Sequence, residues 1–271
     1  MNKKQLINDI IISSERSYLK KKNDINIHEI IAEKETICDK SQAQQYTLWP
    51  CEESDIENVH LMLIGETGKG KTTLINGILN FVLDINCHNV YRFCVPVNFA
   101  MPDKRDIDIQ TEKVTLYKIP YVDGMRYNKN LLLTDTPGLL DTRGIEYQKQ
   151  CSEQVKLFLE HSVNKEKLII GIVAEANLTL DNSVKNLINL IQEIVQGLSN
   201  VKIILIATFA TIRDPPMFSL LKQNLNVKVD DQFKINNKII SSKIDINDEK
   251  SQQKWLSWES DMESLLNQIQ T

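Results

Sequence analysis

A glycine-rich stretch at residues 65–72, GETGKGKT, has the residue types and the spacing that bind phosphate groups. It fits the pattern G-x-x-x-x-G-K-T, follows the apolar run Val59–Ile64 and precedes a helical pattern. The glycines let successive backbone N–H groups point inward, and the following helix adds its free N–H groups and the positive end of its dipole. We expect Lys71 to reach the β- and γ-phosphates and the Thr72 hydroxyl to bind Mg²⁺.

A second motif, Asp135-Thr136-Pro137-Gly138, follows the apolar run Leu131–Leu133. An aspartate at the end of a strand can hold the Mg²⁺ shell, and the backbone N–H of Gly138 can meet an oxygen of the γ-phosphate. That contact exists only while the γ-phosphate is present, so the following loop is expected to switch between two arrangements. The pattern D-x-x-G is common by itself, but it becomes specific when it ends a strand downstream of a phosphate loop.

Residues 84–112, between the two motifs, show no clear periodicity and are where a nucleotide-sensing switch is expected. Thr111 stands just before an alternating run and is the candidate hydroxyl for Mg²⁺ and the γ-phosphate, with Thr115 as the alternative. The same segment holds Cys87 and His88. Without further ligands at metal spacing, this pair indicates a loop rather than a metal site or a nucleophile.

The composition excludes several classes of protein. The chain has 271 residues, a net charge of −4, 42% hydrophobic and 25% charged residues, which is typical of a globular protein without a basic nucleic-acid-binding face. Its five cysteines are scattered without C-x-x-C spacing, so neither a zinc site nor a disulfide framework is indicated. No apolar run approaches the roughly 20 residues of a membrane span, and no signal peptide opens the chain. We expect a cytoplasmic protein.

Apolar segments alternate with helical patterns along residues 58–271. The near-continuous apolar runs at 167–174 and 201–207 indicate buried parallel strands, and residues 184–198 show the clearest helical pattern. This alternation predicts an α/β fold with a mostly parallel central sheet that helices cover on both faces. Such sheets bind ligands at the carboxyl ends of their strands, where both motifs fall.

Residues 1–57 differ in character and are expected to form a helical N-terminal extension to a domain of residues 58–271. Apolar residues recur at helical spacing in two places, at Leu6, Ile7, Ile10 and Ile11 and at Ile27, Ile30 and Ile31. A structural cap of the domain and an interaction segment are both compatible with this pattern.

From about Val59 to Ile269 the chain resembles the septin-like and immunity-associated (AIG-type, TRAFAC class) branch of P-loop GTPases. The segments GETGKGKTTLIN and LTDTPGLLDTRGI are similar to the phosphate loop and the second switch of that family, and Thr111 falls at its switch threonine. TFATIRDPP resembles the TFAD-type segment that these relatives use in place of N-K-x-D, and FKINNKI and the last W-x-x-W resemble their C-terminal part. The resemblance implies a three-layer P-loop NTPase G domain that binds GTP or GDP with Mg²⁺, and a homodimer across the nucleotide face.

The motifs and the resemblance together give the candidate site residues. The candidates for nucleotide binding are Gly65, Glu66, Thr67, Gly68, Lys69, Gly70, Lys71, Thr72, Thr73, Thr208, Phe209, Thr211, Asn236 and Asn237. The candidates for Mg²⁺ are Thr72, Thr111 and Asp135, and those for catalysis are Lys71, Thr111, Gly138 and Arg143.

Two positions depart from the pattern of the family. Thr211 stands where the relatives have an acidic residue that accepts hydrogen bonds from guanine; its hydroxyl accepts one such bond without charge, and Asp214 is the alternative acceptor. Leu139 follows D-x-x-G, where many small GTPases have a glutamine that orients the attacking water. Arg143 and Lys69 are then candidates for a charge supplied to a neighbouring active site, the alternative being that both are structural.

The expected function is a GTP-binding switch with slow Mg²⁺-dependent GTP hydrolysis, with dimerisation as the candidate activator. Two alternatives stay open. One is a nucleotide-bound assembly scaffold with little or no hydrolysis, and the other is a P-loop ATPase with the same phosphate grip.

Overall fold

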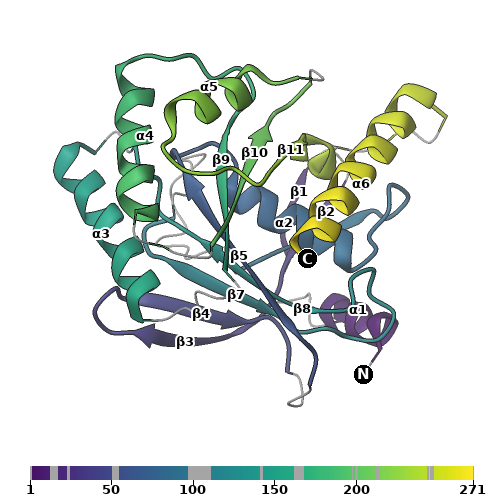
Figure 1. The fold of residues 1–271 in the computed structure, drawn as a ribbon. Coiled ribbons are helices and arrows are strands. Elements are labelled where there is room, and N and C mark those ends of the chain that lie inside the picture. Colours follow the sequence, from purple (N-terminus) through teal and green to yellow (C-terminus); the bar gives the residue numbers. More distant parts are fainter. Residues whose placement is uncertain are drawn as a thin grey trace.

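A computed structural model describes residues 2–12, 18–22, 25–50, 55–96, 111–140, 143–161, 168–196, 198, 201–211, 214–242, 244 and 247–270. Within these ranges the chain forms an eight-stranded sheet with the order β11-β10-β9-β5-β8-β7-β4-β3 (Figure 1). Its strands are β3 (Glu33–Cys38), β4 (Ala43–Thr47), β5 (Asn58–Gly65), β7 (Thr115–Ile119), β8 (Asn130–Asp135), β9 (Leu168–Glu175), β10 (Lys202–Thr208) and β11 (Asp231–Ile235). The pairs β7–β8 and β3–β4 are antiparallel and the others are parallel, so the expected mostly parallel α/β sheet is confirmed.

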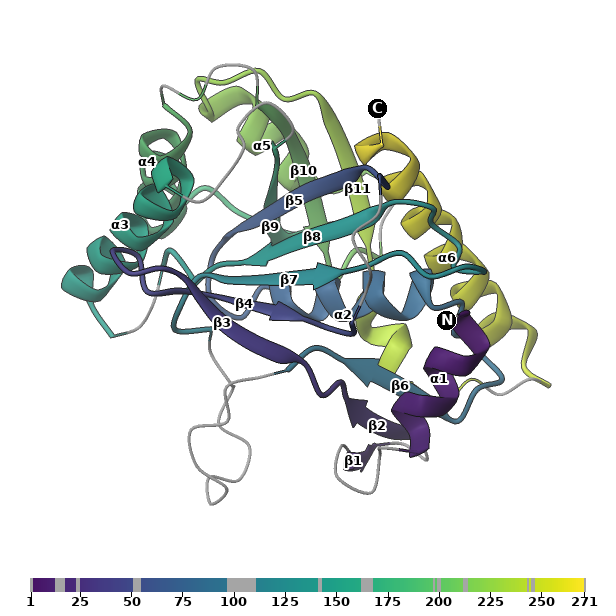
Figure 2. The same ribbon diagram turned by 90° about the horizontal axis from the view of Figure 1, so that it is seen from below.

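Helices cover both faces of this sheet (Figure 2). Those of the described chain are α1 (Lys3–Ile12), α2 (Lys71–Val82), α3 (Ile145–His161), α4 (Asn182–Val195), α5 (Pro216–Asn224), the 3₁₀ helix η3 (Asn237–Ser241) and α6 (Glu249–Ile269). In both ribbon views α3 and α4 lie on one side of the sheet, and α2 and α6 lie on the other. None of the described helices is both long and apolar enough to cross a membrane.

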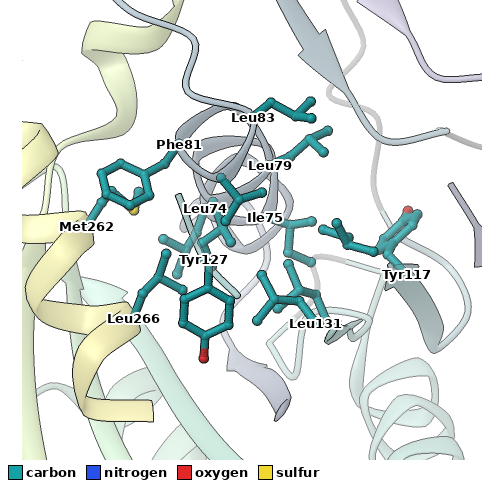
Figure 3. Close-up of a cluster of buried hydrophobic side chains, with 14 of the residues drawn as sticks. Leu74, Ile75, Leu79, Phe81, Leu83, Tyr117, Tyr127, Leu131, Met262 and Leu266 are labelled. Carbon is teal, nitrogen blue, oxygen red and sulfur yellow. The ribbon is translucent and has the colours of Figure 1, made fainter. Parts of the chain in front are cut away.

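Alternation along β5 distributes its side chains between two buried cores. Leu61 and Leu63 point to the face that α2 and α6 cover, whereas Met62 and Ile64 join the cluster formed with α3, α4 and α5. A strand that is buried on both faces reads as a continuous apolar run, which explains the pattern VHLMLIG. Figure 3 shows the first of these cores, where side chains of α2 pack against α6, β7 and β8.

Among the described residues of the segment 1–57, α1 is the one helix, so the prediction of a helical extension is confirmed for this part alone. The prediction of a second short helix around Ile27, Ile30 and Ile31 is wrong, because this stretch forms β2 (Ile25–Glu29) and the irregular segment that follows it. β2 lies between β1 (Tyr18–Lys22) and β6 (Tyr91–Cys94) in a separate three-stranded sheet. β3 and β4 follow and belong to the central sheet, where β3 is the edge strand and β4 pairs in parallel with β7. β2 and β4 each pair with a strand that is distant in the sequence, β6 and β7, which local periodicity cannot reveal.

Side chains of α2 close the free edge of β6. Asn80 donates from Nδ2 to the carbonyl of Phe93 at 2.7 Å and accepts from the Phe93 N–H at 3.0 Å. One helical turn earlier, Asn76 Oδ1 accepts from the N–H of Val95 at 2.9 Å. Two amides at i and i+4 therefore satisfy backbone groups that a further strand would otherwise bind. They fix the small sheet to the helix that follows the phosphate loop.

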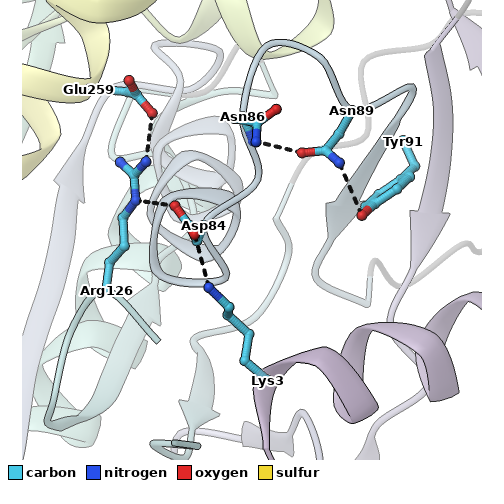
Figure 4. Close-up of polar contacts among 7 residues, drawn as sticks. All are labelled: Lys3, Asp84, Asn86, Asn89, Tyr91, Arg126 and Glu259. Atoms are coloured by element: carbon cyan, nitrogen blue, oxygen red, sulfur yellow. Dashed lines mark hydrogen bonds and ion pairs between the residues drawn. The ribbon is translucent and has the colours of Figure 1, made fainter. Parts of the chain in front are cut away.

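Ion pairs attach α1 to the end of α2 (Figure 4). Lys3 Nζ lies 2.9 Å from Asp84 Oδ2, and Arg126 contacts the other oxygen of the same carboxylate. Arg126 Nη2 also lies 3.0 Å from Glu259 Oε1 of α6. Both cations hold the pKa of Asp84 below its usual range against the opposing effect of burial. The bridge connects three helices that are far apart in the sequence.

Candidate nucleotide site

The candidate residues converge because parallel strands bring their carboxyl ends to one edge of the sheet. β5, β8, β9, β10 and β11 run parallel to their neighbours in the centre, and the loops that leave them meet at this edge. β7 runs antiparallel to β8, with Thr115 opposite Asp135, so the start of β7 lies at the same edge. The residues that precede β7, including Thr111, therefore lie beside the end of β8.

The stretch at residues 65–72 forms a tight loop between β5 and α2, as its pattern predicts. Gly65 approaches β9 so closely that a Cβ there would lie 2.1 Å from the carbonyl oxygen of Val173. Gly70 has φ +88°, in the left-handed region, and stands directly before the first residue of α2. These two positions need glycine for different reasons, and both shape the loop whose N–H groups lie at the start of the helix.

Lys71 is buried at the base of this loop. Its Nζ donates to the carbonyls of Gly65 at 3.2 Å and Glu66 at 3.0 Å. Burial lowers the pKa of Lys71, while Asp135 and Glu66 act in the opposite direction. A cation held in a buried loop of backbone N–H groups is suited to an anionic ligand of high charge.

Three oxygen-bearing side chains meet beside Lys71. Thr72 Oγ1 donates to Asp135 Oδ2 at 2.5 Å, and Thr111 Oγ1 donates to the same oxygen at 2.9 Å. The two hydroxyl oxygens lie 3.3 Å apart. The structure thus brings together all three residues that the sequence analysis assigned to Mg²⁺.

The environment of Asp135 fits a divalent cation. The residue is 1% exposed, and its Oδ1 has no hydrogen-bond partner among the described residues. Burial raises the pKa of Asp135, although Lys71 and the hydroxyls of Thr72 and Thr111 oppose this effect. A buried carboxylate with one free oxygen and two neighbouring hydroxyls is a set of hard oxygen donors, which Mg²⁺ prefers.

The loop after β8 lies against the phosphate loop. Thr136 Oγ1 donates to the carbonyl of Leu63 at 2.8 Å, and the N–H of Leu139 donates to the carbonyl of Gly65 at 3.1 Å. Gly138 touches Thr67 so closely that a Cβ on it would lie 1.7 Å from Thr67 Oγ1. The side chain of Leu139 is 0% exposed and belongs to the core formed with α3 and α4. Leu139 is thus a core residue.

Arg143 connects the two segments that flank this site. Its Nη1 lies 3.5 Å from Glu112 Oε1, next to Thr111, and its guanidinium lies 3.6 Å from the ring centroid of Tyr147. Lys69 is engaged in a comparable way, with Nζ 2.9 Å from Glu175 Oε2 at the end of β9. The hydrogen bond to Glu175 raises the pKa of Lys69. Both residues make contacts within the chain, in line with the structural alternative.

Thr208 fixes the end of β10 to the phosphate loop. Its Oγ1 lies 2.9 Å from the carbonyl of Lys69 and 3.1 Å from that of Ala174, so one hydroxyl joins the ends of β9 and β10 to the phosphate loop. Phe209 follows with φ +53°, an uncommon conformation for an aromatic residue. Lys238 Nζ lies 5.3 Å from the centroid of its ring.

A hollow of about 180 Å³ opens beside this aromatic residue, next to the start of α2. It is lined by Gly70, Thr73, Thr208, Phe209, Asn237, Lys238 and Ser241. Five of these seven were candidates from the sequence; Lys238 and Ser241 were missed. Lys238 lies within the segment FKINNKI, and its position just after the end of β11 is the signal that identifies it in retrospect.

The remaining candidates for the base have different positions. Asn236 caps η3, since its Oδ1 accepts from the N–H of Lys238 at 3.3 Å. Thr211 is exposed and does not line the hollow, and the exposed Asp214 does not line it either. The structure therefore brings Thr73, Thr208, Phe209 and Asn237 to one cavity but leaves Thr211 outside.

The central sheet and its strand–glycine loop–helix define the fold as that of a P-loop nucleoside triphosphatase. No protein-family model matches the chain, and no curated protein matches it. One matching solved structure is a chain of the signal recognition particle receptor SRb-GTP/SRX complex from Chaetomium thermophilum. It is 13% identical in sequence, and the match covers 78% of this chain and 99% of that chain with a TM-score of 0.40. Another comes from the chloroplast translocon components atToc33 and psToc159, for which dimerization is described as important for GTPase activity. It is 16% identical and covers 80% of this chain and 84% of that chain, with a TM-score of 0.48. At this level of similarity neither structure indicates what this chain binds.

Proposed function

We propose that the protein is a GTP-binding switch with slow Mg²⁺-dependent GTP hydrolysis. The observation that carries this proposal is the meeting of Thr72, Thr111 and Asp135 beside Lys71, with one carboxylate oxygen left for a cation. These residues come from three separate segments, so their convergence at the mouth of a glycine loop is more specific than either motif alone.

In this proposal each group has one task. Lys71 and the N–H groups of the loop hold the β- and γ-phosphates, and Thr72 with Asp135 orients the cation. Thr111 and the N–H of Gly138 report whether the γ-phosphate is present. Bound Mg²⁺ would neutralise charge on the phosphate oxygens, while the chain contributes position and a low-dielectric surrounding.

Slow hydrolysis is supported by the position of Leu139. Its side chain is apolar and wholly buried, so it can neither orient nor deprotonate a water molecule. The contact of Arg143 with Glu112 and Tyr147 leaves its guanidinium engaged on its own chain. The intrinsic rate then depends on charge neutralisation by Lys71 and the cation.

Homodimerisation across the nucleotide face is part of the proposal and comes from the family resemblance. Two exposed apolar side chains support it: Ile145, 70% exposed at the start of α3, and Leu180, 45% exposed before α4. Ile145 begins the helix that follows β8, and Leu180 lies in the loop that follows β9. An approaching second copy would bury them and could exchange the Arg143–Glu112 contact for an intermolecular one.

The second candidate function is a nucleotide-bound assembly scaffold without useful turnover, which the burial of Leu139 also favours. Phosphate release measured over a hundredfold range of protein concentration separates the two. Turnover per molecule that rises with concentration supports a hydrolase activated by dimerisation, whereas bound GTP with no phosphate release at any concentration supports the scaffold.

Binding itself is tested by titrating the full chain with a fluorescent guanine nucleotide, with Mg²⁺ and with EDTA. We expect saturable binding that EDTA weakens. If no nucleoside triphosphate binds at millimolar concentration, the proposal is wrong. If ATP displaces the probe better than GTP does, the chain is a P-loop ATPase.

A further inference from the structure

The cavity beside Phe209 offers hydrogen-bond donors and a cation but no carboxylate. Among the described residues that line it, Lys238 carries the one charge, and Thr73, Asn237 and Ser241 supply the polar side chains. Glu175, the acidic residue at the end of β9, is not among the residues that line the hollow and is engaged with Lys69. A purine base that enters this hollow therefore faces hydrogen-bond donors and not a carboxylate of these lining residues.

The amide of Asn237 has a fixed orientation. The indole N–H of Trp258 can only donate, so the oxygen of the amide must face it, and the Nε1–Oδ1 distance is 3.0 Å. The same oxygen lies against Gly77, where a Cβ would approach it to 2.6 Å. The –NH₂ group is consequently the end of the amide that remains for another partner.

This –NH₂ group is buried and lacks a protein acceptor. Asn237 is 7% exposed, and its Nδ2 has no hydrogen-bond partner among the described residues. A buried donor without an acceptor is unfavourable, so a ligand atom that accepts from it gains affinity. Asn237 is one of the residues that line the hollow.

From these observations the structure assigns a class of ligand to the hollow, the 6-oxopurine nucleotides. The Asn237 amide recognises their O6 atom, and the site does not distinguish between the substituents at C2. This inference rests on the proposed function. Guanine, hypoxanthine and xanthine all present an acceptor at O6, whereas adenine presents an amino group that would face the –NH₂ group of Asn237.

The three 6-oxopurines differ at C2, which carries an amino group, a hydrogen atom or an oxygen atom. A carboxylate at the C2 edge would select the amino group strongly, because it would be left unpaired by hypoxanthine and would repel the oxygen of xanthine. The family resemblance puts that carboxylate at the position of Thr211, which is exposed, lies outside the lining of the hollow, and has a hydroxyl that can donate as well as accept. None of the three substituents is therefore penalised.

Competition against a fluorescent guanine nucleotide on the full chain tests this selectivity, with GTP, ITP, XTP and ATP as competitors. We expect GTP, ITP and XTP to agree within about tenfold, and ATP to be weaker than all three by more than tenfold. A preference of GTP over ITP of about a hundredfold or more would overturn the inference, as would equal binding of ATP and GTP.

A substitution of Thr211 should make the chain distinguish GTP from ITP. Thr211→Asp should raise the ratio of GTP to ITP affinity at least tenfold and weaken XTP, because the new carboxylate pairs with the amino group and repels the oxygen. Thr211→Val, of the same shape without the hydroxyl, should leave the ratio unchanged. If Thr211→Asp folds and binds GTP with an unchanged ratio, residue 211 lies away from C2 and the inference is wrong.

The two proposals fail differently. Absence of binding by all four nucleotides contradicts the proposed function itself, whereas a strong GTP preference in the wild-type chain contradicts only the relaxed selectivity. Inorganic tripolyphosphate serves as a further probe, since it reports the phosphate loop without a base.

Discussion

The hydroxyl of Thr111 donates to the carboxylate of Asp135 at 2.9 Å, although 24 positions separate the two residues. The antiparallel pairing of β7 with β8 produces this contact, because it sets Thr115 opposite Asp135 and brings the preceding residues to the end of β8. The same carboxylate oxygen accepts from Thr72 at the start of α2. One buried oxygen thus connects the helix after the phosphate loop with both candidate switches.

Lys71→Ala should weaken nucleotide binding at least a hundredfold, because it removes the one cation buried in the described part of the phosphate loop. Lys69→Ala is the matched control. Its side chain pairs with Glu175, so we expect binding within about fivefold of the wild type. Titration with a fluorescent nucleotide measures both, and circular dichroism verifies the fold. Equal losses in the two variants would argue against the role of Lys71.

Leu139→Gln should not accelerate hydrolysis, although it restores the residue that many small GTPases have there. The position is wholly buried in the core, so the new amide would lack partners and cost about 3 kcal/mol of unfolding free energy. Thermal unfolding and phosphate release are the measurements. Leu140→Gln, at a half-buried neighbour, should cost less. Faster phosphate release at an unchanged melting temperature would contradict the buried position.

Arg92 should help to bind the base of the nucleotide, because it holds η3 in place. Its guanidinium is buried, donates from Nε to the carbonyl of Ile240 at 3.0 Å and lies 4.9 Å from the ring centroid of Trp255. Arg92→Met keeps the apolar contact but frees η3, so GTP affinity should fall about tenfold while tripolyphosphate affinity stays unchanged.

Arg126→Met is the control for this effect. Arg126 also stacks on an aromatic ring, that of Phe81 at 4.9 Å, and also binds α6 through Glu259, but no described contact joins it to η3. We expect both GTP and tripolyphosphate to bind this variant normally. A similar loss of GTP affinity in both variants would indicate general destabilisation instead.

His60 should make the fold less stable in mild acid. Burial lowers its pKa from 6.5 to about 4, and its Nε2 lies 2.7 Å from Thr134 Oγ1. Between these two pH values the unfolded chain binds a proton that the folded chain does not, so stability falls as the pH falls. From pH 7 to pH 5 the contribution is on the order of 2 kcal/mol.

Urea unfolding of the wild type and of His60→Gln at both pH values isolates this contribution. The difference between the two pH values should be smaller in the variant by that amount, because all other titrating groups are common to both. Identical pH dependence in the two proteins would mean that His60 keeps an ordinary pKa in the fold.

The phosphate loop and the D-x-x-G segment could be predicted because each depends on a strand, a loop and a helix that are adjacent in the sequence. The strands β3 and β4, at one end of the central sheet, could not be predicted. β3 reads EKETIC and β4 reads AQQYT, polar segments whose conformation is stabilised by pairing with each other and with β7. Their propensity is weak, and their partner lies in a part of the sequence that local patterns do not reach.

The role of Asn237 was equally inaccessible. Its presence near the base follows from its place after the last strand, but the direction of its amide depends on Trp258, a residue of the terminal helix. Likewise, the sequence shows that Leu139 is apolar, but only the packing of α3 and α4 shows that it is a core residue.

The pairing of β4 with β7 and of β2 with β6 has a consequence for biosynthesis. β2 and β4 leave the ribosome first, yet the strands that complete them are translated only after the phosphate loop and its helix. Until then the nascent chain holds open strand edges that can associate with other chains. We expect the protein to acquire its fold late in translation and to benefit from chaperones that shield these edges.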